Sequence, residues 1–277
     1  LPPLDLPAKL RAHHLTPKKS LGQNFLLDDS TLRRIVAAAE IPPHAEVLEI
    51  GPGAGSLTRY LALAAQRVVA VELDAALIPI LGEVLAGVEN VSIVHGDILK
   101  QNPSDLMHQP GYWVVANIPY YITSSVIRHL LEASVRPACV VLTIQREVAE
   151  RICAAPGDLS LLALSVQLYG RPRAVARIPA GAFYPPPKVD STVLRVDLYD
   201  EPRIPQSQIE DFFRLAKAGF SQKRKTLRNS LSGGLGWKPD RAVALLAAAE
   251  IDPMRRAETL SIEEWARLTQ QFCELAK

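Results

Sequence analysis

The sequence predicts an α/β fold, in which helices cover both faces of a sheet, followed by a small all-helical domain. Two observations support this prediction. Between residues 46 and 198, short apolar runs rich in β-branched residues alternate with amphipathic stretches. After the proline-punctuated segment 200–205, the strand pattern stops and helical periodicity continues toward the carboxyl terminus.

Composition and length set the broad class of the protein. The 277 residues, of which 48% are hydrophobic and 22% charged, are typical of a soluble globular protein. No apolar run approaches the roughly 18 residues of a membrane span, and the amino terminus lacks a secretory signal, so we expect a cytoplasmic protein. The three cysteines lie far apart without metal-ligand spacing, so neither disulfides nor a metal site is expected. The net charge of +2 identifies no partner by itself.

The predicted elements follow one another in the order that a mainly parallel sheet requires. The first 15 residues are proline-rich and lack periodicity, so we expect a flexible arm. Strands are predicted at 46–50, 67–72, 91–95, 112–117, 138–145 and 192–198, with antiparallel pairing allowed at the end of the sheet. Helices are predicted at 56–65, 75–85, 124–132 and 145–153, and then at 206–218, 223–231, 240–248 and 261–275. The predicted domains are therefore the arm (1–15), a sheet domain (16–201) and a helical domain (202–277).

A glycine-rich turn, Glu49-Ile50-Gly51-Pro52-Gly53-Ala54-Gly55, follows the first predicted strand. Its glycines allow a tight turn and the close approach of a ligand. Glu72 ends the next strand, at the position from which a carboxylate accepts both hydroxyls of a ribose, and Asp97 follows the third strand. A plain strand-to-helix turn and solvated loop acids are the alternatives for these residues taken singly.

The spacing and charge of this turn indicate which ligand it binds. Gly-x-Gly-x-Gly differs from the Gly-x-Gly-x-x-Gly of dinucleotide-binding folds. The acidic Glu49 suits a cationic sulfonium better than a pyrophosphate. We therefore expect S-adenosylmethionine (SAM), with Glu72 at the ribose, Asp97 at the adenine amino group and Gly51 near the methionine part.

The motif Asn117-Ile118-Pro119-Tyr120 follows a buried strand and lies at the carboxyl edge of the sheet, where open α/β folds bind ligands. A nucleobase amino group is a poor nucleophile because its lone pair is delocalised into the ring. The Asn117 side-chain oxygen and a backbone carbonyl of Ile118 or Pro119 would accept the amino hydrogens and aim the lone pair at a methyl carbon. Tyr120 would stack on the base. The motif predicts methyl transfer to a nucleobase nitrogen, with a tight turn and a core tyrosine as the alternative.

Two groups of basic residues predict contact with nucleic acid, because phosphates are their natural counter-charge. They are Lys223, Arg224, Lys225 and Arg228 in one predicted helical stretch, and Lys18 and Lys19 near the amino terminus. The alternatives are a solvated face of an amphipathic helix for the first group and a merely soluble tail for the second. The proline-stiffened loop 183–188 adds an aromatic rim that suits base stacking.

The chain closely resembles the KsgA family of small-subunit ribosomal RNA adenine dimethyltransferases. The matching stretches run in family order over nearly the whole chain, at 21–26, 49–58, 71–74, 96–97, 117–121, 145–149, 183–190 and 220–231. The resemblance implies a Rossmann-like class I SAM-dependent methyltransferase domain and a helical domain that orients RNA. It also implies transfer of two methyl groups to the N6 of each of two adjacent adenines near the 3′ end of the RNA. The implied partner is an assembling small ribosomal subunit, and we expect a monomer.

With this resemblance, the site residues form two overlapping sets. The predicted cofactor-binding residues are Gln23, Asn24, Leu26, Glu49, Gly51, Gly53, Glu72, Asp97, Ile98 and Asn117. The predicted catalytic residues are Asn117, Ile118, Pro119, Tyr120 and Phe183, of which Tyr120 and Phe183 would sandwich the adenine.

Two other functions remain open. The related large-subunit adenine methyltransferase of macrolide resistance shares the catalytic constellation, and a non-catalytic RNA-binding assembly or transcription factor shares the fold. The stretches 183–190 and 220–231 favour the small-subunit enzyme over the first, and the intact Asn117, Pro119 and Tyr120 argue against the second. The chain departs from the family at 158–163, which lacks the usual Tyr-Gly pair before Leu-Ser, so the RNA contact of that loop stays open.

Overall fold

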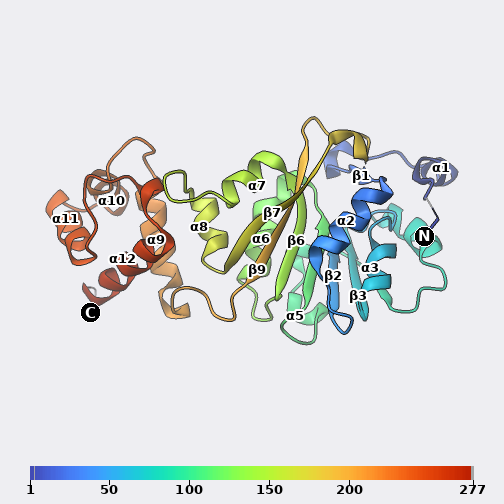
Figure 1. Ribbon diagram of the computed structural model, residues 1–277, viewed down its shortest axis with the longest axis horizontal. Coiled ribbons are helices and arrows are strands. Elements are labelled where there is room, and N and C mark those ends of the chain that lie inside the picture. Colours follow the sequence, from blue (N-terminus) through green and yellow to red (C-terminus); the bar gives the residue numbers. More distant parts are fainter. Residues whose placement is uncertain (3, 276–277) are drawn as a thin grey trace. The chain divides into compact units, whose positions relative to one another are not determined.

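The computed structural model describes residues 1–2 and 4–275, and it divides into two compact units (Figure 1). Unit 1 contains Leu1–Ala149 and Pro172–Leu198, and unit 2 contains Glu150–Arg171 and the chain from Tyr199 onward. The predicted boundary at residue 201 lies close to the second of these crossings. The segment 150–171, which we expected in the sheet domain, belongs to unit 2 because its helix packs on the carboxyl-terminal helices.

Unit 1, in its described residues, is built on a seven-stranded sheet with the order β4-β3-β2-β5-β6-β9-β7. The strands are β2 (Glu46–Ile50), β3 (Arg67–Glu72), β4 (Val91–His95), β5 (Trp113–Asn117), β6 (Cys139–Gln145), β7 (Gly170–Ile178) and β9 (Ser191–Leu198). The pairs from β4 to β6 are parallel, and β9 runs antiparallel to β6. The central strands are continuous apolar runs because helices cover both faces of the sheet (Figure 1).

The chain order of the strands creates a switch point in this sheet. From β2 the chain continues to β3 and β4 on one side, and it returns to β5 and β6 on the other. The connections that leave β2 and β5 therefore run in opposite directions. In open α/β sheets, a crevice forms at the carboxyl ends of two neighbouring strands whose connections diverge in this way, here β2 and β5.

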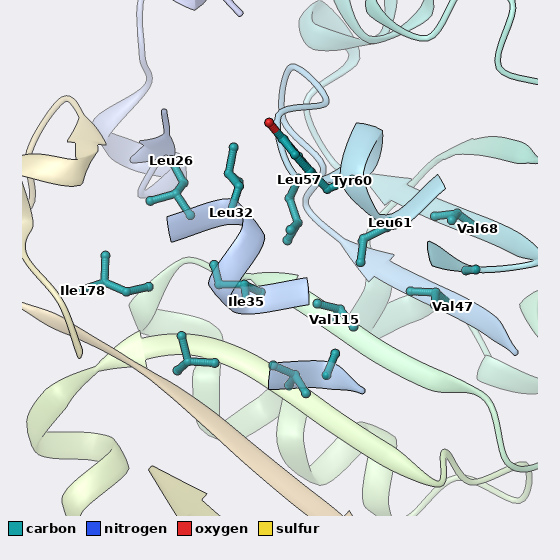
Figure 2. Close-up of a cluster of buried hydrophobic side chains, with 14 of the residues drawn as sticks. Leu26, Leu32, Ile35, Val47, Leu57, Tyr60, Leu61, Val68, Val115 and Ile178 are labelled. Atoms are coloured by element: carbon teal, nitrogen blue, oxygen red, sulfur yellow. The ribbon is translucent and has the colours of Figure 1, made fainter. Parts of the chain in front are cut away.

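The helices of unit 1 fix the sheet on both faces. They are α2 (Asp29–Ala39), α3 (Thr58–Ala64), α4 (Ile78–Val84), α5 (Pro103–Leu106) and α6 (Thr123–Leu131), and α7 (Arg146–Ile152) continues into unit 2. The sequence did not predict α2, whose N-cap is Asp28. The Asp28 carboxylate accepts a hydrogen bond from the Thr31 amide at 2.8 Å. Leu32 and Ile35 of α2 are buried with Leu57 and Leu61 and with residues of the sheet (Figure 2).

The first 15 residues differ from the flexible arm that we expected. Helix α1 (Leu6–Ala12) is capped by Asp5, and it buries Leu6 and Leu10 in a small cluster with Phe25 and Ile80. Two leucines four residues apart in a proline-rich stretch are too short a pattern to reveal this helix. Downstream, β1 (Phe25–Leu26) pairs antiparallel with β8 (Phe183–Tyr184).

Unit 2 is helical in its described part. Its helices are α8 (Leu161–Gln167), α9 (Ile209–Phe220), α10 (Leu227–Leu235), α11 (Pro239–Ala248) and α12 (Ile262–Leu275). The fully buried side chains of Phe212, Leu231 and Trp265 come from three of these helices and form its apolar interior. Among the described residues of both units, no helix combines the length and apolarity that a membrane crossing requires.

Candidate active site

A cavity opens at the switch point of the sheet, and strand ends supply most of its wall. β2 contributes Glu49 and the turn behind it, β3 contributes Glu72, the segment after β4 contributes Asp97 and Ile98, and β5 contributes Asn117. The segment 21–26 and Phe183 of β8 complete the lining. All predicted cofactor-binding and catalytic residues line this one cavity: Gln23, Asn24, Leu26, Glu49, Gly51, Gly53, Glu72, Asp97, Ile98, Asn117, Ile118, Pro119, Tyr120 and Phe183.

The glycine turn after β2 brings bare backbone to the cavity. Gly51 and Gly53 have φ angles of 67° and 61°, in the left-handed region that side chains disfavour. A Cβ atom on Gly53 would also lie 3.0 Å from the Phe25 ring. The Gly53 amide donates a hydrogen bond to Glu72 Oε2 at 2.9 Å. The turn is therefore tied directly to the carboxylate at the end of the neighbouring strand.

Two buried carboxyl groups give the cavity its electrostatic character. Glu49 is 1% exposed and Glu72 is 5% exposed. Glu72 Oε1 accepts the Asp74 amide at 2.8 Å, so each of its oxygens holds one backbone N–H and keeps further acceptor capacity. No described residue donates a hydrogen bond to Glu49 Oε2.

Burial decides how these carboxyl groups titrate. It raises the pKa of Glu49 to about 8, and the nearby Glu72 charge acts in the same direction. Burial also raises the pKa of Glu72, although the backbone amides of Asp74 and Gly53 oppose that effect. Two such acids favour a cationic or hydroxyl-bearing ligand and disfavour an anion.

The Asn117 amide is held at one end only. Its Nδ2 donates a hydrogen bond to the backbone carbonyl of Asn24 at 3.0 Å. The oxygen Oδ1 is therefore the end of the amide that is left for a ligand, and no described residue donates to it. Ile118 is buried, and Pro119 fixes the backbone of the loop that follows.

Aromatic side chains that follow Asn117 in the sequence complete the lining of the cavity. The Tyr120 hydroxyl lies 2.7 Å from Ser191 Oγ, and burial raises the pKa of Tyr120, so the phenol is neutral at pH 7. Phe183 is buried, and its backbone pairs with Leu26 across the two short strands. Tyr121, the residue after Tyr120, is 62% exposed and lines the same cavity.

The predicted RNA-binding residues lie in two different settings. Lys223, Arg224 and Lys225 lie in the turn between α9 and α10 and not in a helix, which corrects the prediction. The segment 221–226 holds no large apolar side chain to bury, so α10 begins only at Leu227. These three residues and Arg228 are exposed.

The amino-terminal basic residues also differ from each other. Lys19 is exposed, whereas Lys18 Nζ donates to the buried carboxylate of Asp74 at 2.7 Å.

Some residues that the sequence did not predict support the site by contacting the residues that line or flank it. Asp74 and Ser191 bind Lys18 and Tyr120, and Phe25 packs against the glycine turn. For Asp74 a signal existed, because an acid directly after a strand and before a helical turn is a common cap, and its Oδ1 accepts the Ala76 amide at 3.1 Å. Nothing in the sequence pointed to Ser191.

Comparison with known proteins places the chain in a family. The model of the family described as ribosomal RNA adenine dimethylase matches residues 14–273. Ribosomal RNA small subunit methyltransferase A of Dehalococcoides mccartyi (strain CBDB1) is 46% identical over 270 residues, which are 95% of this chain and 91% of that protein. The protein of the same name from Moorella thermoacetica (strain ATCC 39073 / JCM 9320) is 43% identical over 274 residues, 95% of each chain.

Solved structures agree in fold over both units. A dimethyladenosine transferase from Plasmodium falciparum superposes with a TM-score of 0.79 at 25% identity, over 91% of this chain and 98% of that one. The 23S rRNA methyltransferase ErmE superposes with a TM-score of 0.73 at 31% identity, over 90% of this chain and 99% of that one. With a family model that matches nearly its whole length, the chain belongs to the ribosomal RNA adenine dimethylase family.

Proposed function

We propose that this protein dimethylates the N6 amino groups of two adjacent adenines near the 3′ end of small-subunit ribosomal RNA, with SAM as methyl donor. The observation that carries the proposal is the Asn117 amide, whose nitrogen is bound by the Asn24 carbonyl and whose oxygen faces no protein donor among the described residues. It lines one cavity with two buried acids, Glu49 and Glu72, and with the aromatic rings of Tyr120 and Phe183 among others. The relatives named ribosomal RNA small subunit methyltransferase A support the choice of RNA.

The cavity residues suit SAM in charge and in shape. A bound sulfonium would favour the ionised forms of Glu49 and Glu72, two buried acids whose pKa burial raises in the ligand-free protein. Glu72 keeps acceptor capacity for ribose hydroxyls beside its two amide bonds. Asp97 would accept the adenine amino group, and Gln23, Asn24, Leu26 and Ile98 would close the walls around the ligand. The glycine turn leaves room for the methionine part because a Cβ atom is missing at Gly51 and Gly53.

SAM supplies an electrophilic methyl group, and the protein's task is to orient the acceptor nitrogen. Asn117 Oδ1 and a backbone carbonyl of Ile118 or Pro119 accept the two amino hydrogens, which localises the lone pair. Tyr120, neutral and tethered to Ser191, stacks on one face of the base, and Phe183 stacks on the other. The acceptor amine becomes acidic as the new bond forms, so water can take its proton and no strong general base is required.

The remaining parts of the proposal concern the partner. The exposed basic turn of unit 2 would contact RNA phosphates, and unit 1 would hold the cavity. We place the protein in the cytoplasm, as a monomer that acts on an assembling small subunit. The resemblance to ErmE makes the large-subunit RNA the second candidate substrate.

Labelled methyl transfer tests the proposal. Unmodified small and large subunits are incubated with the protein and methyl-labelled SAM, and the modified bases are mapped. We expect label only in the small subunit, on two adjacent adenines, with two methyl groups on each. Label confined to the large subunit would support the second candidate, and no label with tight RNA binding would support a non-catalytic binder.

Asn117→Ala should lower the rate of transfer at least about 100-fold, because its oxygen acts as a preorganised acceptor in the transition state. RNA affinity should stay within about twofold, since binding relies mainly on phosphate contacts. Asn102→Ala is the control, because Asn102 caps α5 away from the cavity lining. Equal turnover in Asn117→Ala and the wild type would refute the role of Asn117.

A further inference from the structure

Residues 21–26 form part of the cavity wall, and the segment 18–26 that contains them is held by two side chains far away in the sequence, Asp74 at Lys18 and Gln23 and Asn117 at Asn24. We infer that Asp74 is a positioning residue that, through Lys18 and Gln23, holds this segment over the cofactor cavity and thereby orients the Asn117 amide. The inference rests on the proposed function, because it concerns the same cavity and the same reaction.

Asp74 is the buried end of this connection. Its side chain is 7% exposed and accepts hydrogen bonds from Lys18 Nζ at 2.7 Å, from Gln23 Nε2 at 2.8 Å and from the Ala76 amide at 3.1 Å. Burial acts to raise the pKa of Asp74, but the bonds from Lys18 and Gln23 outweigh it and keep the pKa below its usual range. A carboxylate that is buried, charged and bonded on both oxygens holds its partners in one geometry.

The segment that Asp74 holds is itself closed into a compact turn. The Lys18 amide donates to Gln23 Oε1 at 2.7 Å, and the Gln23 amide donates back to the Lys18 carbonyl at 3.3 Å. Between them, Gly22 has a φ of 62°, and a Cβ atom there would lie 3.1 Å from Pro119 Cβ. The turn therefore moves as one body and rests against the loop that carries the catalytic motif.

The other end of the segment reaches the reacting group. Directly after Gln23, the Asn24 carbonyl accepts the hydrogen bond from Asn117 Nδ2 at 3.0 Å. Two residues later, Leu26 pairs with Phe183. A displacement of the turn would release the Asn117 amide to rotate and would shift the aromatic wall, so the anchor at Asp74 acts on catalysis through other residues.

This geometry also decides between two roles for Lys18. As an RNA contact, its ammonium would be drawn away from the Asp74 carboxylate, which is 7% exposed and would lose its cationic partner. Within the fold, Lys18 is the cationic partner of Asp74. We therefore assign Lys18 to the support of the cofactor site and leave Lys19, which does not take part in the bond to Asp74, as the RNA contact of the pair.

Two variants and their combination test the connection. Lys18→Met and Asp74→Asn should each weaken the binding of S-adenosylhomocysteine about tenfold, measured by calorimetry, and should each lower kcat about tenfold. The double variant should be no worse than the worse single variant, because both changes break one connection. Lys18→Arg, which keeps the charge, should recover at least half of the lost affinity. Lys9→Met is the control, because Lys9 of α1 pairs with Glu83 of α4 at 3.6 Å and neither residue lines the cavity.

The outcomes separate this inference from the proposed function. Wild-type affinity and kcat in Lys18→Met and Asp74→Asn, or strictly additive losses in the double variant, would overturn the inference while the enzyme remains. A Lys18→Met variant with weaker RNA binding but unchanged cofactor binding would make Lys18 an RNA contact and would also overturn it. A wild-type protein that binds neither SAM nor its product would instead defeat the proposed function. If Asp74→Asn does not fold, Lys18→Met and its recovery in Lys18→Arg give the test from the exposed side of the connection, because Lys18 does not line the cavity.

Discussion

Two polar residues that line the cavity, the buried Glu49 and the half-buried Asn117, lack a full set of protein partners. Glu49 keeps one carboxyl oxygen without a hydrogen bond from any described residue, and Asn117 is bonded through its nitrogen alone. A buried polar atom without a partner costs on the order of 1–3 kcal/mol. Such groups persist where a ligand supplies the missing interaction, so a lower stability of the ligand-free protein is the expected consequence.

Glu49→Gln tests this cost through its pH dependence. The pKa of Glu49 in the folded protein, about 8, lies above its ordinary value of 4.5. The folded chain therefore holds a proton that the unfolded chain releases between these values, and stability falls as the pH rises from about 4.5 to 8. Glutamine does not titrate, so its advantage in Tm over the wild type should grow from near zero at pH 5 to roughly 10 °C at pH 8.5.

The measurement is thermal unfolding of both proteins without SAM across this range. Glu89→Gln, at an exposed position, serves as the control and should change Tm by the same small amount at every pH. A difference between Glu49→Gln and wild type that does not depend on pH would mean that Glu49 stays charged in the folded protein.

At the scale of elements, most strands of the seven-stranded sheet were predicted from the sequence, whereas the edge strand β7 and the helices α1 and α8 were not. The predicted strands match β2, β3 and β4 at both ends, and β5, β6 and β9 within one residue, because strands buried on both faces are continuous apolar runs. The edge strand β7 was missed because its residues 170–178 include Pro172 and three arginines, and only its two ends are buried. Helices α1 and α8 are seven residues long, too short for a clear period.

The candidate site likewise contains residues that the sequence predicted and contacts that it did not. Glu49, Glu72, Asp97 and Asn117 could be predicted because each lies at the carboxyl end of a recognisable strand or just after it, and parallel strands bring their carboxyl ends to one edge. The bonds of Lys18 to Asp74 and of Asn117 to Asn24 join residues 56 and 93 positions apart. They depend on how segment 18–24 folds back over the cavity, and no local pattern in the sequence describes that path.

The packing of α9 and α10 gives a prediction at the same scale. A Cβ atom on Gly234 of α10 would lie 2.6 Å from the Cα atom and 3.1 Å from the carbonyl oxygen of Ala218 in α9. Because these are backbone atoms, the helices would have to separate, and Gly234→Ala should destabilise unit 2 by about 1–3 kcal/mol.

Its neighbour provides a matched control. A Cβ atom on Gly233 would meet only the end of the flexible Gln222 side chain, at 3.2 Å. Gly233→Ala should therefore stabilise α10 by up to about 1 kcal/mol, through helix propensity alone. Urea unfolding followed by tryptophan fluorescence measures both, since Trp237 and Trp265 lie in unit 2. Equal losses in the two variants would show that the close approach of the helices is not what Gly234 provides.

At the scale of the whole molecule, the distribution of charge matters more than its sum. The net charge of +2 is small, yet Lys223, Arg224 and Lys225 gather in one exposed turn of unit 2, with Arg228 just beyond it. The cavity is lined entirely by residues of unit 1. RNA affinity and cofactor affinity should therefore respond to different substitutions.

Replacing Lys223, Arg224 and Lys225 by glutamine tests this separation. If each residue neutralises one phosphate, the slope of log affinity for ribosomal RNA against log salt should become shallower by roughly 2–3, and affinity at low salt should fall most. Affinity for SAM should stay unchanged, because no residue of the turn lines the cavity. Arg33→Gln with Arg34→Gln, on the exposed face of α2, lowers the net charge by two in unit 1 and should leave the slope as it is. A slope that falls equally in both variants would mean that RNA responds to the overall charge of the protein and not to this turn.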